Sequence, residues 1–252
     1  MDTKTKLKTI AVLYAMEDEA KPFITLTGAK RQTGVLDSKL PMVHYETMVK
    51  ETTVHIVCFG KDKDFRVDVV GKHGASVATM ETIYKIRPDL IINAGTSGAF
   101  DFPEAKINQV YVAIENVFIN DRRISVPGFE EYVTGRVPVT KVTKLQKDLD
   151  LPGAIVSSSD SLDMVESDVK MARSQKAKLL DMEVGTIAWV ARQYEIPLIA
   201  LKGISNYVYE VGDTKHLDEF TEYLGDTATV IGNTLLKVID YIDGKTLQDL
   251  SE

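Results

Sequence analysis

Short apolar runs bounded by turn residues alternate along this chain with longer amphipathic stretches. Strands buried under helices on both faces are apolar throughout, whereas half-exposed strands alternate apolar with polar residues. The runs that predict strands cover residues 9–14, 54–59, 90–94, 110–117, 155–158 and 198–204, and helices are predicted over 67–86, 184–194 and 216–242. This pattern predicts an α/β fold, a three-layer α/β/α sandwich with a central mixed, twisted sheet.

Length and composition fit one domain spanning residues 1–252, because 44% apolar residues can supply one large core. A net charge of -7 disfavours nucleic acid as a partner, since binders of the phosphate backbone usually carry a basic face. No apolar run approaches the roughly 18 residues of a membrane span. The single cysteine, Cys58, lies in an apolar run and predicts a buried thiol in a reducing, cytoplasmic setting.

Two stretches, residues 28–41 and 127–152, lack clear periodicity and predict loops or hairpins over the sheet edge. Ligands of such sheets bind at the carboxyl ends of the strands, so the residues after each run are the candidates for chemistry. The first strand is followed by acids, of which Glu19 can point back toward the strand ends one helical turn later. A small-residue turn at 93–100, a polar turn at 157–164 and Met182-Glu183 follow in the same way.

Neither a metal centre nor a serine nucleophile is predicted. The four histidines, His44, His55, His73 and His216, show no ligand spacing along the chain. No serine lies in a Gly-x-Ser-x-Gly turn.

Five ordered motifs nevertheless form a specific set. They are Ala15-Met16-x-x-Glu19, then residues 92–96 (INAGT), 159–164 (SDSLDM), 181–183 (DME) and 202–205 (KGIS). Together they resemble the 5'-methylthioadenosine nucleosidase family, and residues 120–124 (NDRRI) look like its plant-type branch. The resemblance implies a nucleoside phosphorylase-like fold, a homodimer, and cleavage of the N-glycosidic bond of methylthioadenosine, and sometimes S-adenosylhomocysteine, with no metal or organic cofactor.

The resemblance also implies roles for individual residues. Glu19 matches the base that activates the attacking water, Glu183 the carboxylate that binds the ribose 2'-hydroxyl, and Met182 a residue lining the ribose and base. Further substrate contacts are implied at Thr96 near the ribose, Leu162 and Asp163 at the adenine edge, Lys202 and Ser205 in the last motif, and Leu217 on the wall of the 5' pocket.

Water is the expected nucleophile. Related phosphorylases hold phosphate with an arginine where this chain has Asn93, and with another near the first strand, where this chain has only acids at 17–19. A hydrolase is therefore favoured over a phosphorylase.

One position departs from the family. Asn206 stands where the family has an aspartate that protonates purine N7. An amide can donate to N7 and accept from the adenine amino group, but it supplies no proton, and general-acid catalysis is typically worth about 100 to 10,000-fold.

Several interpretations of Asn206 therefore stay open. The protein is a methylthioadenosine hydrolase slowed by Asn206, a hydrolase in which Glu210 or Asp213 replaces the acid, an enzyme for 6-oxopurine nucleosides, or a purine-binding protein of low activity. The first of these is the leading prediction.

Overall fold

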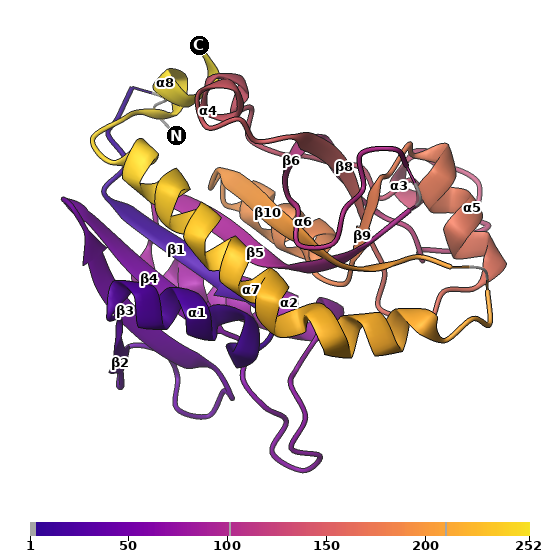
Figure 1. Ribbon diagram of the computed structural model, residues 1–252, viewed down its shortest axis with the longest axis horizontal. Helices are drawn as coiled ribbons and strands as arrows, with labels where there is room; N and C mark the ends of the chain where they lie inside the picture. The colour runs from indigo at the N-terminus through magenta and orange to yellow at the C-terminus, as the bar shows by residue number, and fades with distance from the viewer. Residues whose placement is uncertain (1–3, 101, 210) are drawn as a thin grey trace.

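A computed structural model describes residues 4–100, 102–209 and 211–252 (Figure 1). Its strands are β1 (Thr9–Tyr14), β2 (Lys30–Gln32), β3 (Val43–Val49), β4 (Thr52–Cys58), β5 (Leu90–Ala99), β6 (Val110–Ile119), β7 (Val137–Pro138), β8 (Gly153–Ser158), β9 (Leu179–Asp181) and β10 (Leu198–Tyr207). Its helices are α1 (Glu17–Thr27), α2 (Gly71–Ile86), α3 (Glu130–Val133), α4 (Thr143–Asp148), α5 (Glu166–Ser174), α6 (Val184–Gln193), α7 (Lys215–Ile242) and α8 (Leu247–Ser251).

The strands form one mixed sheet with an open part and a closed part. In the open part, β4, β1, β5 and β10 run parallel to one another, and β3 and β2 extend the sheet antiparallel at one side. In the closed part, β5 pairs with both β10 and β9, and the pairings β10–β6, β6–β8 and β8–β9 complete a ring of five strands. The central mixed sheet expected from the sequence is therefore present, with a closure that the apolar runs did not predict.

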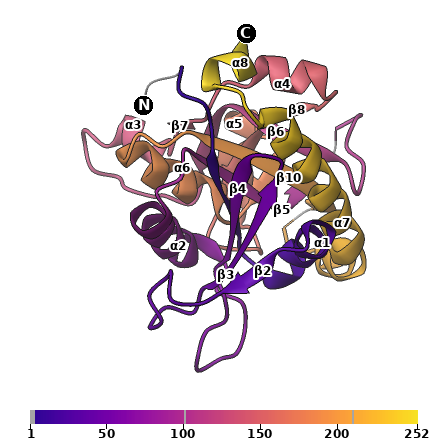
Figure 2. The same ribbon diagram turned by 90° about the vertical axis from the view of Figure 1, so that its left-hand side faces the viewer.

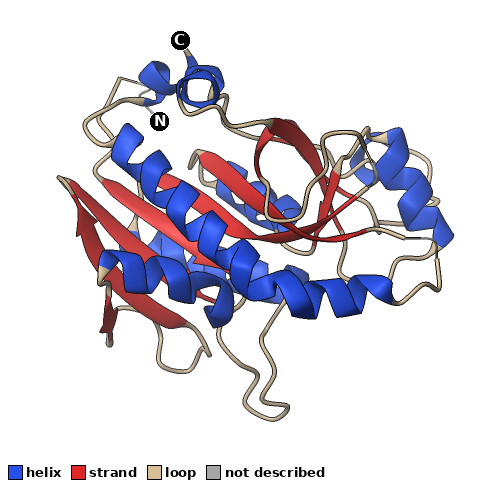
Figure 3. Ribbon diagram, in the orientation of Figure 1, coloured by secondary structure: helices blue, strands red, loops and turns tan. Residues whose placement is uncertain are grey.

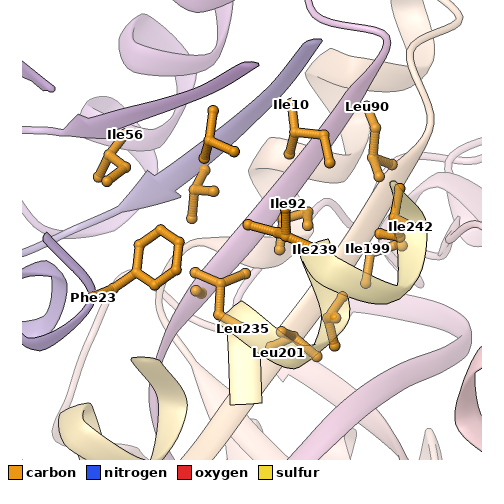
Figure 4. Close-up of a cluster of buried hydrophobic side chains, with 14 of the residues drawn as sticks. Ile10, Phe23, Ile56, Leu90, Ile92, Ile199, Leu201, Leu235, Ile239 and Ile242 are labelled. Carbon is orange, nitrogen blue, oxygen red and sulfur yellow. The ribbon is translucent and has the colours of Figure 1, made fainter. Parts of the chain in front are cut away.

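Helices cover both faces of the sheet (Figures 2 and 3). α1 and α7 pack on one face, where Leu235 and Ile239 of α7 meet Ile92 of β5 beside Phe23 of α1 (Figure 4). α2 and α6 pack on the other face, through side chains such as Ala78. No helix in the described ranges is both long and apolar enough to cross a bilayer.

All six predicted strands exist. β4, β6 and β8 differ from their predicted bounds by no more than two residues at either end, whereas β5 and β10 extend furthest beyond theirs. β5 continues to Ala99 and β10 to Tyr207, because the two strands stay paired through a bulge to the Tyr207–Ala99 register, and Gly98 and Ala99 also pair with β9. Cys58 is buried, as its apolar run predicted.

The boundary and loop predictions needed correction. The helix predicted over 67–86 begins only at Gly71, because Val70 is still extended. The stretch 28–41 contains β2, and the stretch 127–152 contains α3, β7 and α4. β3, β9, α5 and α8 were not predicted at all.

Candidate active site

A cavity of about 470 Å³ opens at the carboxyl ends of β1, β5 and β10. The predicted residues that line it are Glu19, Thr96, Leu162, Asp163, Met182, Glu183, Ser205 and Asn206. The strand order explains this meeting, since β5 lies between β1 and β10 and all three run in the same direction. Residues far apart in the sequence thus share one wall.

Glu19 is a buried carboxylate with a fixed position. It lies in the first turn of α1, where its Oε2 accepts a 3.3 Å hydrogen bond from the backbone N–H of Met16. Its Oε1 accepts from the N–H and the hydroxyl of Thr96, both at 2.7 Å. Gly95 makes this approach easy, because a Cβ there would lie 3.2 Å from Glu19 Oε1. Burial raises the pKa of Glu19, and the Thr96 hydrogen bonds and the Lys202 charge oppose that rise.

Glu183 is a second buried carboxylate on the same cavity. It precedes α6, and its Oε1 accepts a 2.9 Å hydrogen bond from the N–H of Gly71 at the start of α2. Gly71 has φ +81°, and a Cβ there would lie 2.4 Å from Asp160 Oδ1, so only glycine fits. Burial raises the pKa of Glu183 to about 7, with Asp181 adding to the rise and Lys202 opposing it.

Lys202 is buried and is not one of the residues that line the cavity. Its Nζ is 2.7 Å from Asp181 Oδ2, and both side chains are buried. Burial lowers the pKa of Lys202, but the charges of Asp181 and Glu183 outweigh burial and leave it raised. Asp181 in turn accepts hydrogen bonds from Ser158 and from the N–H of Val184. Lys202 is therefore a buried partner of Asp181 whose charge acts on both glutamates, and the substrate contact expected at Lys202 stays a prediction.

Asn206 lies at the end of β10 with its amide oriented by neighbours. Its Oδ1 accepts a 2.9 Å hydrogen bond from the hydroxyl of Ser205, and its Nδ2 donates a long 3.4 Å bond to the Tyr207 carbonyl. A Cβ at Gly98 would lie 3.1 Å from Nδ2, so β5 also packs closely against the amide. One N–H of the amide lacks a protein acceptor among the described contacts and can donate to a ligand.

The sequence offers two acids, Glu210 and Asp213, that could replace the missing aspartate. Glu210 lies outside the described residues. Asp213 does line the cavity, but its carboxylate accepts a 2.9 Å hydrogen bond from the N–H of Lys215, which lowers its pKa. A carboxylate stabilised in its ionised form is a poor proton donor, so the structure disfavours Asp213 in that role.

The expected wall residue Leu217 does not line the cavity. α7 begins at Lys215, and His216 and Phe220, four residues apart on one helical face, line the cavity instead. Leu217 points elsewhere and is 38% exposed. Neither residue was predicted from the sequence. Their separation by four positions in the predicted C-terminal helix was the signal that places them on one face.

Two of the four histidines, which are scattered along the sequence, lie close together in the fold. His44 and His55 lie on neighbouring strands, with His44 Nε2 3.0 Å from His55 Nδ1. The register of β3 and β4 brings them together, and β3 was not predicted.

Comparisons with known proteins agree with this geometry. The family model described as the phosphorylase superfamily matches residues 9–240. A 5'-methylthioadenosine/S-adenosylhomocysteine nucleosidase of Arabidopsis thaliana is 36% identical over 98% of this chain and 96% of the relative. The apo structure of the A. thaliana 5'-methylthioadenosine nucleosidase is 34% identical, with a TM-score of 0.93 over 98% of this chain and 100% of that one.

A more distant structure shares the fold at 18% identity, with a TM-score of 0.76 over 94% of this chain and 100% of that one. It is a Helicobacter pylori nucleosidase in which an aspartate is replaced by asparagine, with 5'-methylthioadenosine in its active site. The superfamily match spans most of the chain, and the first A. thaliana relative is similar over nearly its whole length. The chain therefore belongs to the 5'-methylthioadenosine nucleosidase family of the phosphorylase superfamily.

Proposed function

We propose that this protein hydrolyses the N-glycosidic bond of purine nucleosides, with 5'-methylthioadenosine as the substrate and adenine and 5-methylthioribose as the products. The observation that carries the proposal is the placement of two buried glutamates, Glu19 and Glu183, on one cavity. Relatives named for this activity, at 35–36% identity, support the choice of substrate.

Glu19 is the proposed general base. Its Oε1 is fixed by two hydrogen bonds from Thr96, and its Oε2 receives only the longer bond from Met16. Oε2 therefore keeps a lone pair that can accept a proton from water. A general base works best when its pKa lies near the working pH, and burial shifts the pKa of Glu19 upward in that direction.

Glu183 is the proposed ribose ligand. As the purine departs, the sugar develops positive charge, and a fixed carboxylate in a buried site stabilises that charge more strongly than water does. The bond from Gly71 holds one carboxylate oxygen and leaves the other for the ribose hydroxyl. Lys202, paired with Asp181, favours the ionised form of both glutamates through its charge, which makes it a positioning residue.

Water, rather than phosphate, is the proposed nucleophile. No lysine or arginine is among the described residues that line the cavity. Asn93 lies outside the lining and donates its amide hydrogen to the Leu13 carbonyl at 3.1 Å. A phosphate would thus meet acids and no fixed cation.

Asn206 is the proposed base-recognition residue. Its free amide N–H suits N7 of a purine, and it offers no carboxylic proton for the leaving group. The Helicobacter pylori mutant holds 5'-methylthioadenosine in its active site with an asparagine in place of an aspartate, which supports the proposal that a nucleoside can bind without that carboxyl group. Turnover is therefore expected to be slow.

A second candidate function follows from the same amide. An amide N–H donates equally well to O6 of a 6-oxopurine, so inosine and guanosine are the competing substrates. A protein that binds purines with almost no turnover is the other rival.

A substrate panel separates these functions. Pure protein is incubated with methylthioadenosine, S-adenosylhomocysteine, adenosine, inosine and guanosine, with and without phosphate, and the released base is measured by chromatography. Adenine released from methylthioadenosine without phosphate is the expected result. Phosphate-dependent release would identify a phosphorylase, preference for inosine would identify a 6-oxopurine enzyme, and tight adenine binding with no release would identify a binding protein.

A cytoplasmic homodimer is the proposed form of the protein. Four large apolar side chains on α2 and α6, Val77, Met80, Tyr84 and Trp189, are each more than 40% exposed, as expected of a face that a second copy covers. Light scattering coupled to size exclusion should give a mass near 56 kDa, about twice the 28.0 kDa of the chain. Tyr84→Glu with Trp189→Glu should shift that mass to the monomer.

A further inference from the structure

The β3–β4 hairpin gathers three metal-ligand side chains away from the cavity. Glu46 and His55 are direct partners in the antiparallel register, and His44 lies two residues before Glu46 on the same face of β3. His44 Nε2 is 3.0 Å from His55 Nδ1, and His55 Nδ1 is 3.4 Å from Glu46 Oε2. One ligand atom from each residue lies within 4.8 Å of the other two. None of the three residues lines the proposed active site.

Hydrogen bonds alone cannot pair all of the nitrogen and oxygen atoms in this cluster. If His44 Nε2–H donates to His55 Nδ1, the Glu46 carboxylate faces the same nitrogen without a proton between them. If His55 Nδ1–H donates to Glu46, His44 Nε2 has to share that single proton. His44 is 3% exposed, and its Nδ1 has no hydrogen-bond partner in either case. Three atoms that carry lone pairs thus lie close together, and a single proton can form a hydrogen bond between only two of them.

We infer that His44, Glu46 and His55 bind a divalent transition-metal ion of the zinc class. Ligand bonds of about 2.0 to 2.1 Å in a tetrahedral arrangement place neighbouring donor atoms about 3.3 to 3.4 Å apart, close to the 3.0 and 3.4 Å observed here. Two imidazoles and one carboxylate are a ligand set that zinc accepts, with water in the fourth position. The Glu46 side chain is 42% exposed, so solvent can supply that water.

The ion would join β3 to β4 rather than act on the nucleoside. β4 pairs with β1, whose end leads to Glu19, so the hairpin supports the strand beside the site without contributing to the cavity. Bound metal is therefore expected to stabilise the fold and to leave base release unchanged.

Metal titration of full-length, tag-free, chelator-stripped protein tests the inference. Calorimetry with Zn²⁺ should give one ion per chain, Co²⁺ should produce the visible absorption of a tetrahedral site, and Zn²⁺ should raise the Tm by about 2 to 4 °C. Glu46→Gln should weaken Zn²⁺ binding at least tenfold, and His55→Gln should abolish the Co²⁺ spectrum. His73→Gln is the matched control, because His73 is 95% exposed and lies outside the cluster.

Two results would overturn the site. One is wild-type protein that binds neither Zn²⁺ nor Co²⁺, and the other is binding that Glu46→Gln and His55→Gln leave as strong as in His73→Gln. If His55→Gln fails to fold, the test depends on Glu46→Gln alone. That variant is expected to fold, with a circular dichroism spectrum that matches the wild type, because Glu46 is partly exposed. These readouts measure metal, so they stand or fall separately from nucleoside hydrolysis.

Discussion

The two ends of the cavity are built differently. At the sugar end, Glu19 and Glu183 are buried, and backbone N–H groups from Thr96 and Gly71 hold their carboxylates. At the base end, Asn206 is neutral, and its amide makes one normal and one long hydrogen bond. In the proposed mechanism, charge and positioning are thus concentrated at the sugar, where water attacks, and little is provided for the leaving purine. The base end is therefore the part of the site where a substitution is expected to increase the rate.

The largest expected effect comes from Glu19→Gln, which keeps the shape of the side chain and removes the base. We expect kcat for methylthioadenosine to fall about 1,000 to 10,000-fold, the upper part of the range for general-base catalysis. Glu17→Gln is the matched control, because Glu17 lies in the same helical turn, bonds to Tyr45 and does not line the cavity. Equal losses in both variants would place the effect in α1 as a whole and remove Glu19 as the base.

Glu183→Gln is expected to cost about 100 to 1,000-fold in kcat, the size found when one fixed group that stabilises a transition state is lost. A glutamine oxygen still accepts from Gly71, so circular dichroism should be unchanged. A loss seen mainly in KM would instead assign Glu183 to ground-state binding.

Asn206→Asp should provide an acid that protonates the leaving purine. We expect kcat to rise by about 100-fold, the lower part of the range for general-acid catalysis. The new carboxyl oxygen would lie about where Nδ2 now lies, near the Tyr207 carbonyl, which favours the protonated acid. Asn233→Asp on the exposed side of α7 is the control. No gain for adenine nucleosides, together with a loss for inosine, would show that Asn206 is tuned to 6-oxopurines.

The pH dependence of kcat/KM should show the ionisation of Glu183. Burial raises the pKa of Glu183 to about 7, so kcat/KM should fall about tenfold per pH unit below that value, as the essential carboxylate becomes protonated. The free energy of unfolding should change in the opposite direction and decrease as the pH rises. A carboxyl whose folded pKa exceeds its unfolded value of 4.5 stabilises the fold fully below 4.5, and this contribution is lost as the pH rises through 7.

Thermal melts between pH 4.5 and 8 check the stability part of this prediction. Glu183→Gln should flatten the loss of stability over that window, because the buried charge is gone. Parallel pH profiles of stability in the variant and the wild type would contradict the assignment.

The smallest effect is expected from Asp213→Asn. The Asp213 carboxylate is kept ionised by the N–H of Lys215, so replacing it should change kcat by less than about twofold. A large loss, measured in the same adenine-release assay, would show that Asp213 supplies the missing proton.

Sequence patterns predicted the parts of the fold that depend on burial alone. The run in β1 is apolar because helices α1 and α2 cover its two faces, and it was found residue for residue. β3 carries polar residues such as His44 and Glu46 on one face, and β9 has only three residues, so neither gave an apolar run. Closure of the five-strand ring depends on the pairing of β5 with β9, which no local pattern encodes.

The candidate site was also predicted only in part, because local motifs do not contain the contacts that orient each side chain. The motifs predicted which backbone segments would meet, and eight of the predicted residues line the cavity. Lys202 and Leu217 did not, because side-chain direction depends on the partner in one case and on the start of α7 in the other. Motif order therefore locates a segment, and packing decides which of its side chains reach the ligand.

The strand ring and its neighbours also bear on self-association of the sheet. Five strands of the ring pair on both sides, which leaves β2 and β7 as the terminal strands among those described. β2 has three residues, with Lys30 and Arg31 among them, and β7 has two and ends in Pro138. Short, charged or proline-bearing rims resist the addition of a foreign strand. This chain should therefore stay free of amyloid-type growth at concentrations where a long bare strand would recruit copies of itself.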